Sequence, residues 1–385
     1  EILWSKGYIS AIISDTFPLF APHWEGLNYG RGFDYIHWIR GQGAQGIVDI
    51  DTSINVEVDK FYKPCGMDPF TEKRHREQLK RYLQYISQWD WWDNDECHFV
   101  ARVIKEGISW LKRQISEGRR DKLFLWLDCL DPHEPWDPPT AFSRMYDPNY
   151  EGKELIDFGG EVEGYLTEEE ERHIRALYAG EVTLVDKWIG IFLENLDSMG
   201  ILDNTLLIFI SDHGEPLGRG GWGHGIIKKI KPWPYEEVSH IPFILRHPEG
   251  IGQGKRIKAF VETCDVMPTI LDFLNMPSPK GIHGKSVLPL LTGEKEKIRD
   301  YAYSGYYAKS WSIRDDEWKL ILWLPEEISM LHRKRTKIGF LKASRKPELY
   351  NLKQDPQEQE NLIDKYPDVA NTLELELRRF VDSLA

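Results

Sequence analysis

The sequence lacks the features that mark several large classes of protein. It contains no run of about 18 apolar residues, so no transmembrane helix is predicted, and no signal peptide is visible. Basic residues are in deficit, because 49 Lys and Arg stand against 62 Asp and Glu, which gives a net charge of −13. We therefore expect neither a membrane nor nucleic acid as a partner, although a local basic pocket could still bind a small anion.

Cysteine is also scarce, and the chain shows no internal repeat. The 385 residues contain four cysteines, which are Cys65, Cys97, Cys129 and Cys264. They form no CxxC pair, which argues against a disulfide framework or a zinc knuckle. Free thiols are typical of a reducing compartment, and the expected location is the cytoplasm. The oligomeric state does not follow from the sequence.

Apolar runs and helical periods indicate an α/β fold. Buried strands are predicted at residues 8–14, 122–128, 205–211 and 241–246. Helices are predicted at residues 71–87, at 96–117 and from a capping box of Thr167 and Glu170 to Gly200. Strands that alternate with long helices predict a mostly parallel sheet flanked by helices.

The character of the sequence changes near residue 298. Short antiparallel strands are predicted at residues 301–307, 311–314, 318–323 and 348–351, followed by an amphipathic helix at 367–384. Residues 15–70 are expected to form loops and short elements, and residues 332–346 a basic surface loop. We therefore predict an α/β domain at residues 1–298 and a small α+β subdomain at residues 299–385.

The strongest chemical signal directly follows the predicted strand at residues 205–211. Asp212 and His213 come next, and then Gly214. Ligands of α/β sheets bind at the carboxyl ends of strands, where a carboxylate oxygen and an imidazole nitrogen can converge on one divalent cation. A charged β-turn after the strand is the alternative explanation.

A second signal is the glycine-rich segment at residues 222–225 (WGHG), which two lysines follow. His224, together with Lys229 or Lys228, supplies the donors that bind a tetrahedral oxyanion or protonate a leaving group. The alternative is a solvated glycine-rich loop with surface lysines.

A third signal is the proline-rich segment at residues 131–139 (DPHEPWDPP), which follows another predicted strand. Prolines on both sides restrict the backbone around His133, which favours a rigid anion donor at the same edge of the sheet. A structural histidine in a proline-rich turn is the alternative.

In this order, the motifs resemble the sulfatase family of the alkaline phosphatase superfamily. Further matching segments are YAGEVTLVD at residues 178–186, YEEV at 235–238 and ELYNLKQDP at 348–356. The resemblance spans most of the chain and implies a sulfuric ester hydrolase whose substrate is a small-molecule or saccharide sulfate ester.

The resemblance also implies roles for individual residues. Asp212 and His213 match one pair of ligands to a single divalent metal, which is Ca²⁺, Mg²⁺ or Mn²⁺. His133, His224 and Lys229 match residues that contact the sulfate or its leaving group, with Lys228 as the alternative to Lys229.

The chain departs from the family pattern in one respect. The family carries its nucleophile, a formylglycine made from Cys or Ser, in C-x-P-S-R or S-x-P-S-R, and neither motif occurs in the 385 residues. We expect an N-terminal segment, with the formylglycine and the first pair of metal ligands, to be missing, and the chain as given to be inactive.

Two other functions stay open at this point. The first is a phosphodiesterase or phosphonate monoester hydrolase of the same superfamily. Two-zinc relatives such as alkaline phosphatase carry an Asp with a His four positions later, and no Asp in this chain has one. The comparison therefore favours a single-metal site. The second is a non-catalytic, sulfatase-like binding module, which the missing nucleophile would explain.

Overall fold

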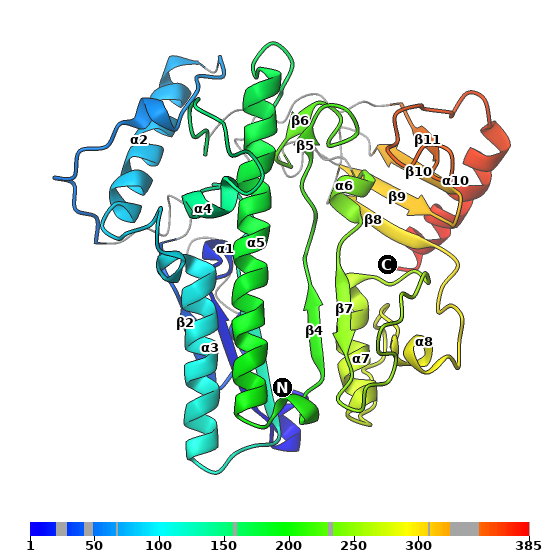
Figure 1. Cartoon of the computed structure of the whole chain (residues 1–385). Helices are drawn as coiled ribbons and strands as arrows, with labels where there is room; N and C mark the ends of the chain where they lie inside the picture. Colours follow the sequence, from blue (N-terminus) through cyan, green and yellow to red (C-terminus); the bar gives the residue numbers. More distant parts are fainter. Residues whose placement is uncertain are drawn as a thin grey trace. The chain divides into compact units, whose positions relative to one another are not determined.

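The protein is described by a computed structural model, shown in Figure 1. The described residues are 1–20, 29–41, 49–66, 68–156, 160–229, 234–306, 309–323 and 346–384. The chain forms two compact units. Unit 1 comprises Glu1–Gly159 and Glu163–Asn204, and unit 2 comprises Gly160–Val162 and Thr205–Ala385.

A three-stranded parallel sheet forms the centre of unit 1. Strand β1 (Ile9–Ser14) lies between β2 (Tyr35–Trp38) and β3 (Leu123–Asp128). β1 and β3 confirm two of the strands predicted from apolar runs, and β2 is a short element inside the segment 15–70. The carboxyl ends of β1 and β3 lie at the same edge of the sheet, where the segment with His133 begins.

Two long helices of unit 1 run side by side and pack on this sheet (Figure 1). They are α3 (Phe99–Ser116) and α5 (Glu168–Ser198). Their contact buries Ile104 and Leu184 and includes Leu127 of β3. The predicted capping box is confirmed, because the Thr167 hydroxyl accepts a hydrogen bond from the Glu170 backbone N–H while the Glu170 carboxylate accepts one from the Thr167 backbone N–H.

Shorter elements complete unit 1. Its other α-helices are α1 (Phe17–Phe20), α2 (Pro69–Ile86) and α4 (Thr140–Ser143). Its 3₁₀ turns are Trp4–Lys6, Val58–Lys60, Asp95–Cys97 and Leu202–Asn204. The predicted helix at residues 71–87 is confirmed as α2, which begins two residues earlier because the Asp68 carboxylate caps the backbone N–H groups of Phe70 and Thr71.

Unit 2 begins with two strands that carry the loops of the strongest predicted motifs. β4 (Leu207–Ile210) pairs with β7 (Phe243–Arg246), so both predicted strands are present. The two strands run antiparallel to each other, unlike the parallel strands of unit 1. The segment between them forms the hairpin of β5 (Leu217–Gly218) and β6 (Ile226–Ile227). The helical elements are α6 (Glu236–Ser239), the 3₁₀ turn Thr263–Asp265, α7 (Val266–Phe273) and α8 (Leu288–Thr292).

The predicted α+β arrangement at the C-terminus is confirmed. Four strands form an antiparallel sheet in the order β11-β10-β9-β8. They are β8 (Ala302–Tyr306), β9 (Ser310–Arg314), β10 (Trp318–Trp323) and β11 (Glu348–Asn351). Helix α10 (Pro367–Asp382) packs on this sheet through Leu373 and Leu377. The predicted boundary after residue 298 stays a proposal.

Three further predictions concern the whole chain. Cys97, Cys129 and Cys264 are free thiols. Within the described ranges, no helix combines the length and the apolar character that crossing a membrane requires. Tyr307 and nearly all of the predicted basic loop at residues 332–346 lie outside the described residues.

Candidate active site

Asp212 and His213 lie together just beyond the end of β4. Asp212 Oδ2 is 3.5 Å from His213 Nε2, and the Asp212 side chain is exposed. His213 Nδ1 is 2.9 Å from the Gly214 carbonyl oxygen, which can only accept, so Nδ1 carries the proton and Nε2 keeps its lone pair. A carboxylate oxygen and an imidazole lone pair at this separation fit one divalent cation, whose neighbouring ligands lie about 3 Å apart.

The glycines of the predicted motifs allow the chain to approach itself closely. A Cβ on Gly214 would lie 2.1 Å from the Glu237 carbonyl oxygen, and the Gly214 N–H donates to the Val238 carbonyl oxygen at 2.8 Å. A Cβ on Gly223 would lie 2.5 Å from the Leu217 backbone nitrogen. Helix α6 can therefore pack directly against the loop that carries Asp212 and His213.

Lys229 belongs to the same cluster in unit 2. Its Nζ lies 3.3 Å from Glu215 Oε1, and this carboxylate oxygen lies 3.9 Å from His213 Nδ1. The side chain of Lys228 is buried, and its backbone adopts a φ of 70°. The structure therefore brings Lys229 into contact with the Asp212–His213 loop through Glu215.

His224 is held by acceptors on both ring nitrogens. Nδ1 lies 2.6 Å from Glu237 Oε1, and Nε2 lies 2.9 Å from the Glu358 carbonyl oxygen. Both nitrogens must then donate, which makes the ring an imidazolium cation. Burial acts to lower the pKa of His224, but the hydrogen bond and charge of Glu237 outweigh it and raise the pKa above its usual value.

The face of this cationic ring lies against an aromatic side chain. The His224 and Tyr235 rings stack with centroids 3.7 Å apart and planes 12° apart, a favourable geometry for a cation. Contact between His224 and a substrate oxygen would require one ring nitrogen to exchange its present acceptor. The predicted role of His224 at a substrate stays a prediction.

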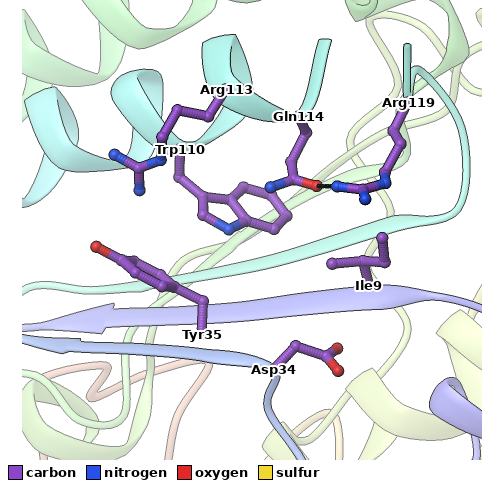
Figure 2. A pocket seen from close by; sticks show the side chains of 7 residues that line it. All are labelled: Ile9, Asp34, Tyr35, Trp110, Arg113, Gln114 and Arg119. Carbon is purple, nitrogen blue, oxygen red and sulfur yellow. Dashed lines mark hydrogen bonds between the residues drawn. The ribbon is translucent and has the colours of Figure 1, made fainter. Parts of the chain in front are cut away.

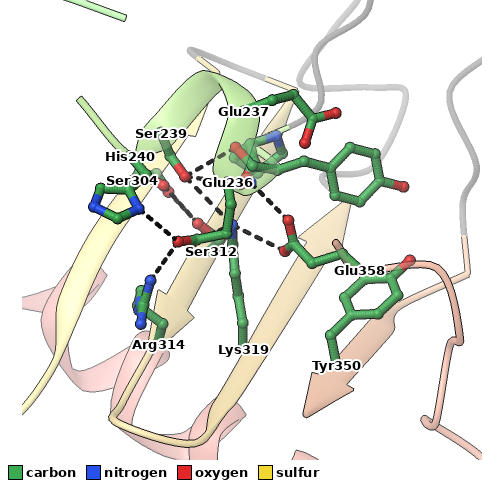
Figure 3. Close-up of polar contacts among 12 residues, drawn as sticks. Glu236, Glu237, Ser239, His240, Ser304, Ser312, Arg314, Lys319, Tyr350 and Glu358 are labelled. Carbon is green, nitrogen blue, oxygen red and sulfur yellow. Dashed lines mark hydrogen bonds and ion pairs between the residues drawn. The ribbon is translucent and has the colours of Figure 1, made fainter. Parts of the chain in front are cut away.

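A largely buried network of ion pairs lies next to the stacked rings of His224 and Tyr235 (Figure 3). Its charged members are Glu236, His240, Arg314, Lys319 and Glu358. Lys319 on β10 is only 1% exposed, and its Nζ lies 3.0 Å from both Glu236 Oε1 and Glu358 Oε1. Burial opposes ionisation of Glu236, but its three cationic neighbours hold the pKa of that carboxyl far below its ordinary value. The network ties α6 and the Glu358 segment to the C-terminal sheet.

His133 lies in unit 1, in the segment after β3. Its backbone N–H donates to the Leu130 carbonyl oxygen at 2.9 Å, and its Nδ1 lies 2.8 Å from the Glu134 carbonyl oxygen. These bonds fix the ring and place a proton on Nδ1, so Nε2 can donate to an anion only when the ring is an imidazolium. Because the other predicted site residues belong to unit 2, their convergence with His133 on one ligand stays a prediction.

Buried carboxyl groups, which the sequence did not single out, surround the His133 segment in unit 1. They are Asp15, Asp131, Asp137 and Glu181. Asp15 accepts a hydrogen bond from the Leu130 N–H at 2.8 Å, and Glu181 of α5 accepts one from the Asp137 N–H at 2.9 Å. Burial, followed by repulsion from neighbouring acids, raises the pKa values of Asp15, Asp137 and Glu181 well above normal.

Comparisons with known families give two matches. The family described as Sulfatase matches residues 51–276. The family described as N-sulphoglucosamine sulphohydrolase, C-terminal, matches residues 223–383. The first match alone spans more than half of the chain and contains all the predicted site residues.

Two relatives illustrate the similarity. An arylsulfatase of Clostridium perfringens is 28% identical over 349 residues, which cover 86% of this chain and 66% of the relative. An N-acetylglucosamine-6-O-sulfatase of Bacteroides thetaiotaomicron is 31% identical over 199 residues, which cover 49% of this chain and 32% of the relative. The chain therefore spans less than two thirds of the length of these relatives.

Solved structures show the same fold. A protein in complex with its substrate D-glucosamine-2-N,6-O-disulfate matches with a TM-score of 0.64 at 20% identity, covering 99% of this chain and 81% of the other. A phosphonate monoester hydrolase of Agrobacterium radiobacter matches with a TM-score of 0.63 at 20% identity, covering 100% and 80%. At this identity the likeness concerns the fold alone.

Proposed function

Because the chain belongs to the sulfatase family, we propose that the protein hydrolyses sulfate esters with the help of one divalent metal ion. The observation that carries this proposal is the pair of Asp212 Oδ2 and His213 Nε2, which lie 3.5 Å apart at the end of β4. The hydrogen bond from His213 Nδ1 to a backbone carbonyl fixes the ring tautomer that metal binding needs.

Asp212 and His213 would hold the metal, which would supply positive charge to the oxygens of the bound sulfate group. The metal is Ca²⁺, Mg²⁺ or Mn²⁺, and the imidazole ligand favours an ion softer than calcium. Two protein ligands are too few for tight binding, so further ligands complete the site. The 385 residues contain neither form of the formylglycine motif, so no step is assigned to that group.

The cationic side chains account for recognition of the anion. Lys229 can donate from its ammonium group to a sulfate oxygen or to the departing alkoxide, since Glu215 engages it on one side only. His133 would add a donor at the end of β3. His224, whose ring nitrogens are both engaged, contributes a fixed positive charge and positions α6 through Glu237.

The proposed substrate is a small-molecule or saccharide sulfate ester. This rests on the relatives named arylsulfatase and N-acetylglucosamine-6-O-sulfatase. A phosphonate monoester is the second candidate, favoured only by the fold it shares with the hydrolase of Agrobacterium radiobacter.

Turnover of 4-nitrophenyl sulfate and of 4-nitrophenyl phenylphosphonate by the complete protein tests these alternatives. We expect faster hydrolysis of the sulfate, loss of activity in EDTA, and recovery with Mn²⁺ or Mg²⁺. The double variant Asp212→Asn, His213→Gln should lose at least about 100-fold in kcat/KM. Asp316→Asn, which changes an exposed acid of unit 2, is the matched control.

Undiminished turnover by the double variant would remove the metal role from these residues. Faster hydrolysis of the phosphonate would establish the second candidate instead.

A further inference from the structure

Unit 1 contains a pocket at the amino-terminal edge of its parallel sheet, opposite to the edge where the His133 segment begins. Its volume is about 460 Å³. Figure 2 shows the residues that line it, which are Ile9, Asp34, Tyr35, Trp110, Arg113, Gln114 and Arg119. Ile9 and Tyr35 are the first residues of the parallel strands β1 and β2, whereas His133 follows the carboxyl end of β3. The proposed hydrolytic function uses none of these seven residues.

Two buried donors of α3 lack acceptors within the described part of the chain. Trp110 is 2% exposed and Gln114 is 8% exposed. The carbonyl oxygen of the Gln114 side chain accepts a hydrogen bond from Arg119 Nη1 at 3.0 Å, but neither its amide N–H groups nor the Trp110 indole N–H has a protein partner there. Both side chains line the pocket, so these N–H groups can donate to the acceptor atoms of a ligand there.

The guanidinium of Arg119 is oriented so that part of it faces the pocket. Its bonds to Gln114 and Glu117 both use Nη1, which leaves the N–H groups of Nε and Nη2 for another acceptor. Arg113 lies 5.2 Å from the centre of the Tyr35 ring, and its Nη2 pairs with Glu106 Oε1 at 3.1 Å. An anionic group therefore meets several donors here, in the geometry that guanidinium groups favour.

The pocket offers one clear acceptor. Asp34 uses Oδ2 to accept hydrogen bonds from the Ser10 N–H and hydroxyl at 2.8 and 2.9 Å, and its other oxygen stays available to a hydroxyl group. A fitting ligand is thus rich in acceptors, negatively charged and equipped with at least one hydroxyl. The volume lies in the usual range for small-molecule sites.

We propose that this pocket binds one unit of an anionic saccharide. The sulfate or carboxylate of the sugar accepts hydrogen bonds from Trp110, Gln114 and Arg119, and a ring hydroxyl donates to Asp34. The pocket is a binding site distinct from the proposed active site, and its occupation does not depend on hydrolysis.

The indole N–H signal of Trp110 in a ¹⁵N-resolved spectrum of the 385-residue chain reports occupation directly. Trp110→Phe identifies this signal by its loss, because phenylalanine has no indole N–H. Glucosamine 6-sulfate and glucuronate are the probes, and glucose is the neutral control. Both anionic sugars should shift the signal in a saturable way, and glucose should leave it unmoved.

Affinities measured by calorimetry then locate the site. Arg119→Gln, which changes an exposed side chain, should weaken binding of both anionic sugars at least tenfold, as should Trp110→Phe. Arg74→Gln, which changes an exposed side chain of α2, should leave the affinity unchanged. The proposal fails if no probe shifts the Trp110 signal, if glucose binds equally well, or if Arg119→Gln binds both anionic sugars as tightly as the unmodified chain.

Discussion

Replacing Lys319 with methionine should destabilise unit 2 by about 3–5 kcal/mol, the usual cost of removing one partner from a buried ion pair. The ammonium group is 1% exposed and lies 3.0 Å from a carboxylate oxygen of both Glu236 and Glu358. Glu236 would keep Arg314 and His240, so most of the loss arises at Glu358, which is equally buried.

Urea denaturation followed by the near-ultraviolet circular dichroism of the aromatic residues measures this loss. Lys353→Met is the matched control in the same subdomain, because Lys353 pairs with Glu317 at 3.2 Å and both side chains are exposed. An exposed pair of this kind contributes about 0–1 kcal/mol.

A second substitution separates lost charge pairing from lost packing. In the double variant Lys319→Met, Glu358→Gln, no unpaired charge remains at residue 358. The double variant should therefore be more stable than the single variant Lys319→Met. A coupling energy of at least about 1 kcal/mol between the two positions is expected. Losses below about 1 kcal/mol for Lys319→Met, or strict additivity of the two changes, would refute the proposed role of the network.

Two further predictions follow from buried groups. Burial lowers the pKa of His98 in unit 1 to about 4. In the unfolded chain the same imidazole has a pKa near 6.5, so between about pH 6.5 and pH 4 it is protonated in the unfolded chain and neutral in the folded one. The free energy of unfolding should therefore fall by about 3 kcal/mol as the pH drops from about 6.5 to about 4. In His98→Asn this pH dependence of the free energy of unfolding should disappear. An unchanged pH dependence in the variant would contradict the assignment to His98. Gly214→Ala places a Cβ 2.1 Å from the Glu237 carbonyl oxygen, a backbone atom that cannot swing aside, and should cost about 1–3 kcal/mol in thermal unfolding. The control Gly190→Ala, with open space around the new Cβ in α5, should be neutral or stabilising, and equal stability of the two variants would contradict the steric argument.

Local features of this fold could be predicted from the sequence because their physical causes lie within a few residues. The apolar runs became β1, β3, β4 and β7 with ends shifted by one or two residues. The capping box at Thr167 formed as predicted, since both of its hydrogen bonds join residues three positions apart.

Partners that lie far apart in the sequence could not be predicted in this way. His224 bonds to the carbonyl group of Glu358, 134 residues away, and Lys319 pairs with Glu236, 83 residues away. No local pattern around Glu358 shows that its backbone carbonyl meets a histidine. The buried acids near His133 were missed for a related reason, because a carboxyl group carries no sequence signal of its own burial.

The structure ranks the two cations of the predicted glycine-rich segment differently from the sequence, which treated His224 and Lys229 alike. An imidazolium has two N–H donors, and in His224 the Glu237 carboxylate and the Glu358 carbonyl occupy both. An ammonium group has three donors, and the Glu215 carboxylate at 3.3 Å engages Lys229 at one oxygen only. Lys229 therefore keeps donors for an incoming sulfate oxygen. His224 instead stabilises the loop that precedes Lys229 in the sequence.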